Sequence, residues 1–108
     1  MAVAIHDNSK EISDNIKSSI LRGLEKCGLT AERFAKKLAP YDTGNLRNSI
    51  THEVDDGEPA VYIGTNVEYA PYQELGTINM DANPFLKPAV ADHANKYRKI
   101  IENELKNG

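Results

Sequence analysis

The side chains that most often carry catalysis are present in this 108-residue chain, but their spacing does not assemble a reaction centre. Ser18, Ser19 and Ser49 have no histidine beside them in a motif of nucleophilic catalysis. The segment Gly64-Thr65-Asn66 lacks the lysine and the following helix start that a phosphate-binding loop requires. We therefore expect no enzyme activity, no catalytic residues and no cofactor.

Residues that bind metal ions are equally scattered. His6, His52 and His93 show no ligand spacing with one another or with Cys27, so the sequence predicts no zinc site. The acidic turn Asp55-Asp56-Gly57-Glu58 lacks the alternating oxygen ligands of a dedicated calcium loop. We interpret this turn as a solvated hairpin tip and its carboxylates, Asp55, Asp56 and Glu58, as an acidic surface.

The tripeptide Asp42-Thr43-Gly44 matches that of aspartic proteases, whose paired carboxylates share a proton across a dimer axis. In those enzymes the tripeptide lies between two apolar strands, whereas here it follows Pro40 and precedes the polar segment Asn45-Leu46-Arg47-Asn48. We interpret it as a turn in which the Asp42 side chain bonds to the backbone and Gly44 is free to take a positive φ.

Composition indicates one ordinary globular domain over residues 1–108, because 40% of the residues are hydrophobic and 27% are charged. No run approaches the roughly 18 apolar residues that cross a bilayer, and the first residues do not resemble a secretion signal. The single cysteine, Cys27, suits a reducing cytoplasm and is expected to be a small core residue.

Charge is distributed unevenly along the chain. No lysine or arginine occurs from Asn48 to Leu86, while the same stretch holds seven acids. Phosphate contacts dominate the affinity of proteins for nucleic acids, so this region is predicted to be a poor DNA-binding surface. The acids are Glu53, Asp55, Asp56, Glu58, Glu68, Glu74 and Asp81.

A long amphipathic helix is predicted near the N-terminus, because eight apolar residues follow the 3.6-residue period. Ser9 or Asn8 is the expected N-cap and Pro40 the stop. Gly28 is a second place where this segment would divide, but the stripe keeps its phase there and favours one helix. At roughly 40 Å the helix would exceed the roughly 34 Å diameter of a compact domain of this length, so we expect an overhang that contacts a neighbouring subunit. The stripe is Ile12, Ile16, Ile20, Leu24, Cys27, Ala31, Phe34 and Leu38.

Two strands are predicted to form an antiparallel hairpin around the turn 55–59. The first contains Leu46, Ile50 and Val54 at even spacing, and the second is residues 60–65. The segment 69–77 is expected to begin as a helical turn and end as a short strand. Pro84 and Pro88 open a last helix with one apolar face. The fold class is therefore α+β: a long N-terminal helix, a small antiparallel sheet of two to four strands and a C-terminal helix, with both helices on one face of the sheet.

Four segments in this order resemble the small tail-component family of siphophages and prophages, the gene-product-ten-like minor tail, tail-completion or head-tail joining proteins. They are residues 40–50, 61–65, 69–77 and 84–89, and residues 78–83 depart from the basic or small-residue stretch of many relatives. The resemblance implies a structural role in the virion neck with no catalytic residues. It is carried chiefly by Asp42, Thr43, Gly44, Leu46, Gly64, Tyr69, Ala70, Glu74, Gly76, Thr77, Pro84, Phe85 and Leu86.

These motif residues also have physical interpretations of their own. Gly44, Gly64 and Gly76 are expected at turns or close backbone approaches. Tyr69, Phe85 and Leu86 are expected to anchor the core. Glu74 is a candidate for a contact between subunits if it is exposed.

The function predicted from these features is structural: the protein completes the tail, or joins tail to head, within an oligomeric neck ring. The expected partners are copies of itself and other neck and tail proteins, in the virion and, during assembly, in the host cytoplasm. Membranes and sequence-specific nucleic acids are not expected partners. The acidic middle would line a DNA passage or face a basic ring. The alternative is a nucleic-acid-binding or other prophage interaction module that uses the basic residues between Lys10 and Lys37, although acids such as Glu25 and Glu32 are interspersed with them.

Overall fold

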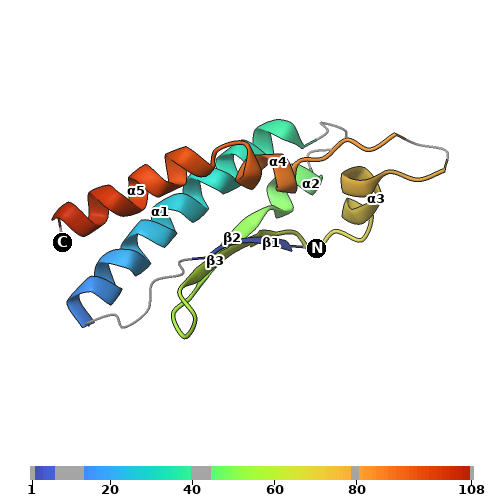
Figure 1. Ribbon diagram of the computed structural model, residues 1–108. Coiled ribbons are helices and arrows are strands. Elements are labelled where there is room, and N and C mark those ends of the chain that lie inside the picture. The colour runs from blue at the N-terminus through green and yellow to red at the C-terminus, as the bar shows by residue number, and fades with distance from the viewer. Residues whose placement is uncertain (1, 7–13, 40–44, 79–80, 108) are drawn as a thin grey trace.

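The computed structural model describes residues 2–6, 14–39, 45–78 and 81–107 and confirms the α+β class (Figure 1). The strands and helices alternate irregularly along the chain rather than in repeating units. In chain order they are β1 (Ala2–His6), α1 (Asp14–Leu38), α2 (Asn45–Ser49), β2 (Thr51–Asp55), β3 (Ala60–Gly64), α3 (Ala70–Leu75), α4 (Leu86–Ala91) and α5 (Ala94–Asn107).

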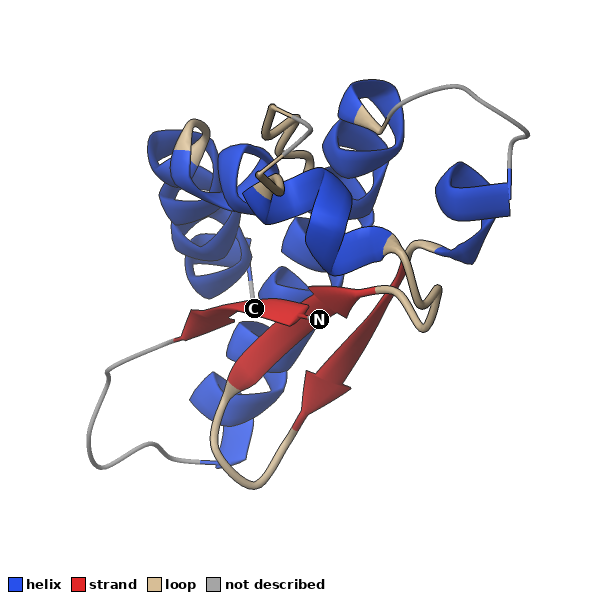
Figure 2. Ribbon diagram, turned by 90° about the vertical axis from the view of Figure 1, so that its right-hand side faces the viewer, coloured by secondary structure: helices blue, strands red, loops and turns tan. Residues whose placement is uncertain are grey.

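The sheet has three antiparallel strands in the order β1-β3-β2, which form a single layer (Figure 2). The predicted hairpin is confirmed, with Val54 of β2 opposite Val61 of β3. The first strand, β1, was not predicted individually. It places Val3 opposite Ile63 and Ile5 opposite Val61, so β3 lies at the centre of the sheet.

Helix α1 is continuous through Gly28, as the unbroken phase of the stripe predicts. The residue serves close packing: a Cβ atom there would lie 2.6 Å from Cδ2 of His52 and 2.7 Å from Cγ2 of Val61. Glycine therefore lets the helix approach β2 and β3 more closely than any other residue would. Ile12 and the predicted N-caps lie outside the described residues.

Two predicted elements are wrong in detail. Leu46 belongs to helix α2 and not to a strand, because the spacing of four between Leu46 and Ile50 fits a helical turn as well as an alternating strand. The C-terminal helix is two helices, divided at Asp92 and His93. At this break the Tyr97 hydroxyl donates a hydrogen bond to the Ala89 carbonyl oxygen, which joins α5 to α4.

Helices α1, α4 and α5 lie on one side of the sheet and α3 lies beyond its end, and among the described residues no helix covers the other face (Figure 1). Helix α1 packs on β2 and β3, and α4 packs on α1 and β1. Helix α5 packs mainly along α1, so the prediction that both long helices lie on the sheet is wrong for α5. The ring of His93 stacks on Phe34, with 3.7 Å between the ring centroids.

The core lies between α1, α4 and the sheet. Its largest fully buried side chains include Phe85, Ile20 and Leu24. Cys27 is buried in the same cluster, as predicted, and burial raises the pKa of its thiol to about 11. The domain is elongated, with extents of 50 × 21 × 21 Å and a radius of gyration of 15.1 Å. The end of the α1–α5 pair where α1 starts and α5 finishes extends beyond the sheet (Figure 1). The predicted contact of this end with a neighbouring subunit stays a prediction.

Candidate interaction surfaces

Glu74 is buried and holds the start of α4 in place. Its carboxylate accepts hydrogen bonds from three consecutive backbone N–H groups, those of Phe85 at 3.0 Å, Leu86 at 2.9 Å and Lys87 at 3.0 Å. These N–H groups lie at the start of α4, where backbone N–H groups have no acceptor within the helix. The helix dipole also favours a negative charge at this end. Glu74 is therefore not exposed, and the condition under which it would be a contact between subunits is not met; it joins α3 to α4.

Most other motif residues also stabilise the fold. Gly76 has a φ of 77°, as expected of a turn glycine, and its N–H donates to the Tyr72 carbonyl oxygen at 2.8 Å. Phe85 and Leu86 are fully buried, which confirms them as core anchors. Gly64 is the last residue of strand β3 rather than part of a turn. Leu46 and Ala70 are buried, whereas Thr77 and Pro84 are exposed; Asp42, Thr43 and Gly44 lie outside the described residues.

The Glu74 contact leaves an apolar surface on the other side of α3. Ala70 and Glu74, four residues apart, form the buried side of this helix. Tyr69, Tyr72 and Leu75, spaced by three, are 38%, 57% and 71% exposed, and Ile78 beyond them is fully exposed. We call Tyr69, Tyr72, Leu75 and Ile78 the arm patch. The prediction that Tyr69 anchors the core is wrong, because it lies on the exposed side.

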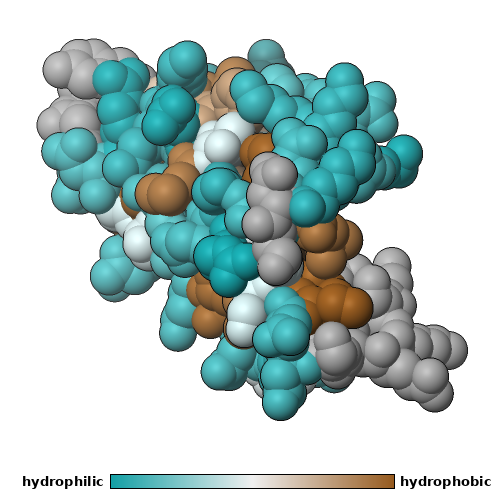
Figure 3. Space-filling model, turned by 90° about the vertical axis from the view of Figure 1, so that its left-hand side faces the viewer, coloured by the Kyte–Doolittle hydropathy of each residue, from teal (hydrophilic) through white to brown (hydrophobic). Residues whose placement is uncertain are grey.

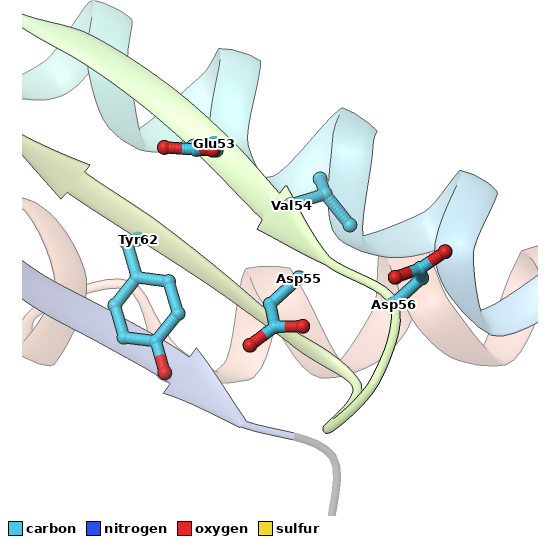
Figure 4. Close-up of a pocket in the computed structure, with 5 residues that line it drawn as sticks. All are labelled: Glu53, Val54, Asp55, Asp56 and Tyr62. Carbon is cyan, nitrogen blue, oxygen red and sulfur yellow. The ribbon is translucent and has the colours of Figure 1, made fainter.

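The acidic surface is exposed as predicted and lies on the β2–β3 hairpin. A hollow of about 420 Å³ lies beside the hairpin (Figure 4). Its lining consists of the carboxylates of Glu53, Asp55 and Asp56 together with Val54 and Tyr62. Glu53 and Tyr62 are directly opposite each other on the two strands. The Gly57 N–H donates to Asp55 Oδ1 at 2.9 Å, which is the side-chain bond of a tight turn. Asp55, Asp56 and Glu58 are all exposed.

His52 forms a polar bridge between the sheet and α1. Its Nε2 lies 2.7 Å from Glu25 Oε1 and its Nδ1 lies 2.5 Å from Glu32 Oε2. Burial disfavours the charged imidazolium, but the hydrogen bonds with Glu25 and Glu32 outweigh burial and raise the pKa of His52. Sequence spacing gave no signal for this pair of contacts. Across the described ranges, no three histidine, cysteine or acidic side chains are grouped to hold a metal ion.

Helices α1 and α5 form the basic part of the molecule. Together they carry ten lysines and arginines against five acids. One of these acids, Glu104, is paired with both Lys26 and Arg22, and these contacts lower its pKa. The end of the molecule where α1 starts and α5 finishes is largely hydrophilic, with apolar side chains showing between the polar ones (Figure 3).

None of the described helices is both long and apolar enough to cross a membrane. No curated protein and no solved structure matches the chain. A family model does match it over residues 4–76, and its description is Bacteriophage HK97-gp10, putative tail-component. The matched region runs from β1 through α3 and includes the sheet, α1 and most of the arm patch. Because this match covers well over half of the sequence, the chain belongs to the HK97-gp10-like family of bacteriophage tail components.

Proposed function

We propose that the protein is a non-enzymatic subunit of an oligomeric neck ring, which completes the phage tail or joins it to the head. The observation that carries the proposal is the arm patch, with Leu75 71% exposed and Ile78 fully exposed. Exposed apolar side chains that cluster in this way are typical of surfaces that another protein covers. Membership of a tail-component family supports a virion location and makes other virion proteins the natural partners.

A gene deletion tests this role. Electron microscopy of lysates that lack the gene should show full heads and separate, unattached tails. Supplying the unaltered gene in trans should restore complete virions, which controls for damage to neighbouring genes. Complete, infectious particles without the gene would contradict the proposal.

The acidic hairpin supports a narrower proposal, that Asp55, Asp56 and Glu58 line the passage of the DNA. These three carboxylates are exposed, and no lysine or arginine occurs between Asn48 and Leu86 to neutralise them. Repulsion between carboxylates and phosphates would let the genome slide without adhering. Replacing the three with Asn, Asn and Gln should lower infectivity, whereas plaque formation at the unaltered level would remove the passage model.

We propose no sequence-specific contact with nucleic acid. The basic residues of α1 are interspersed with acids, and Glu32 is itself paired with Lys36 at 3.1 Å. Filter binding at low salt should therefore retain little DNA. Tight retention of one sequence over others would favour the alternative of a small nucleic-acid-binding module.

A further inference from the structure

The charged side chains of α1 are sorted around the helix. By the 3.6-residue period, its four exposed cations lie within about 60° of one another and about 120–180° around the helix from Gly28, whose position faces the sheet. The acids of α1 form a separate row centred about 100° away, and two of them contact His52. The cations are Arg22, Lys26, Arg33 and Lys37, and the acids are Asp14, Glu25 and Glu32.

Helix α5 borders the cation side of α1 and adds to it. Near the end of α5, Glu104 is paired with Lys26 and Arg22. Near its start, Lys96 Nζ lies 5.4 Å from the centroid of the Phe34 ring of α1. These contacts place both helices along one exposed surface. We call it the basic face, and it consists of Arg22, Lys26, Arg33, Lys37 and Lys96.

The basic face is positive by its local balance of charges. Glu104 is the one acid of α1 and α5 that contacts it, and two cations already share that carboxylate. Glu102 lies about 160° around α5 from Glu104 and so belongs to another side of that helix. Even when exposed Asp92 before α5 is counted, five cations face two acids among the described residues.

The opposite charge lies on the open face of the sheet. Val54 pairs with Val61, which is buried in the core, so its neighbours Glu53 and Asp55 face away from α1. The hollow beside them has Tyr62 in its lining, and an aromatic ring among carboxylates favours a lysine or arginine side chain. We call the four exposed carboxylates the hairpin acids: Glu53, Asp55, Asp56 and Glu58.

The two surfaces cannot meet within one chain. Helix α1 lies between α5 and the sheet, and its exposed cations are on the side opposite to the sheet (Figure 1). Any contact between the hairpin acids and the basic face therefore joins two copies. Such a contact uses a different surface on each copy, so its repetition generates a closed ring when the rotation allows.

We infer that the hairpin acids of one copy dock on the basic face of a second copy. This inference rests on the proposed function and deepens it by naming a contact that would build the ring. It gives the hairpin a role other than lining a DNA passage, because the carboxylates would be covered by protein. The attraction is between exposed charges, so we expect an association that salt weakens.

Charge reversal on each surface, alone and together, provides the test. The hairpin variant is Glu53→Lys with Asp56→Lys, which keeps the Asp55 side chain that the turn uses. The basic-face variant is Arg33→Glu with Lys37→Glu. In analytical ultracentrifugation up to about 1 mM, each variant should associate at least about tenfold more weakly than the unaltered protein. The quadruple variant, with both surfaces reversed, should regain the association because opposite charges face each other again.

A matched control separates the contact from a change in net charge. Asp14→Lys with Glu102→Lys shifts the net charge as the hairpin variant does, but neither residue belongs to the two surfaces. Its association should stay within about twofold of that of the unaltered protein. Raising the salt from about 50 to about 500 mM should weaken the association of the unaltered protein. Far-UV circular dichroism checks that every variant is folded.

The outcomes separate the inference from the function on which it rests. An unaltered protein that stays monomeric at every concentration would overturn both the ring and the docking contact. Unaltered association of the folded hairpin variant, which the passage model predicts, would overturn the docking contact alone and leave a ring built by another surface.

Two further results would overturn the pairing of these particular surfaces. A quadruple variant that associates no better than the two single-surface variants would show that the surfaces do not face each other. Filter-bound DNA at low salt that is lost with Arg33→Glu and Lys37→Glu would assign the basic face to nucleic acid in place of a second copy.

Discussion

Removing the Glu74 carboxylate is the sharpest test of how the fold is held together. In Glu74→Ala the three N–H groups of Phe85, Leu86 and Lys87 lose their acceptor, and the first two are buried. Each buried donor left without a partner costs about 1–3 kcal/mol. With partial access of water to the Lys87 N–H, we expect the free energy of unfolding to fall by about 2–5 kcal/mol. For a domain of this size that corresponds to a decrease in Tm of roughly 10–30 °C.

Glu74→Gln is the matched control for this prediction. Its carbonyl oxygen can keep the bonds that Oε1 accepts from Phe85 and Leu86, but its NH₂ group replaces Oε2, which accepts from Lys87. We expect the free energy of unfolding of Glu74→Gln to be about 1–2 kcal/mol lower than that of the unaltered protein, which is a smaller loss than in Glu74→Ala. Urea unfolding followed by circular dichroism measures all three proteins. A Glu74→Ala protein within about 0.5 kcal/mol of the unaltered one would refute the reasoning, because it would mean that water or other groups satisfy these donors equally well.

Three further predictions concern the packing of α1. Gly28→Ala should lower the free energy of unfolding, measured in urea, by about 1–3 kcal/mol, because its Cβ would overlap His52 and Val61. Alanine's better helix propensity does not compensate for this overlap. Gly23→Ala, whose Cβ would lie 3.3 Å from Ile101, should lower the free energy of unfolding by less. The raised pKa of His52 contributes stability that is fully present below its unfolded pKa of about 6.5 and is lost as the pH rises through the higher folded pKa. A pH series of unfolding curves should therefore show a decline above about pH 6.5, and His52→Gln should abolish it; an equal decline in both proteins would contradict this role. Buried Cys27, with its pKa raised to about 11, should not react with a thiol reagent at mildly alkaline pH until urea is added.

The parts of the fold that could be predicted are those with a long or local signal. Helix α1 repeats its apolar residues over many turns, and a wrong period would have slipped out of phase before Phe34. The hairpin turn at Gly57 and the buried pair Phe85 and Leu86 are also visible in the sequence. In the helix and the turn neighbouring residues decide the structure, and Phe85 and Leu86 are residue types that usually belong to cores.

The parts that could not be predicted depend on contacts distant in the sequence. Strand β1 is only five residues long, and its pairing with β3 joins segments that lie far apart in the chain. Glu74 caps a helix that begins well after it, so no local capping motif reveals the contact. His52 likewise meets Glu25 and Glu32 only because α1 packs on β2.

The candidate site illustrates the same limit. Tyr69 and Leu75 are residue types that usually belong to cores, and their spacing by three fits a buried helix face equally well. The direction that α3 faces is decided by Glu74, whose bonds to the N-terminus of α4 hold the opposite side of the helix against the domain. The exposure of the arm patch is therefore a tertiary property.

The exposed acids next to the arm patch have a physical consequence for specificity. An apolar patch alone would pair with any apolar surface, including the same patch on another copy. With Glu68 and Asp81 exposed on either side of it in the sequence, an arm-to-arm pair brings like charges together. Glu74, the single acid of α3, adds little to this repulsion because it is buried and three N–H groups surround its carboxylate. The acidic segment 68–81 thus holds α3 in place through its buried member, Glu74, and disfavours arm-to-arm association through its exposed members, Glu68 and Asp81.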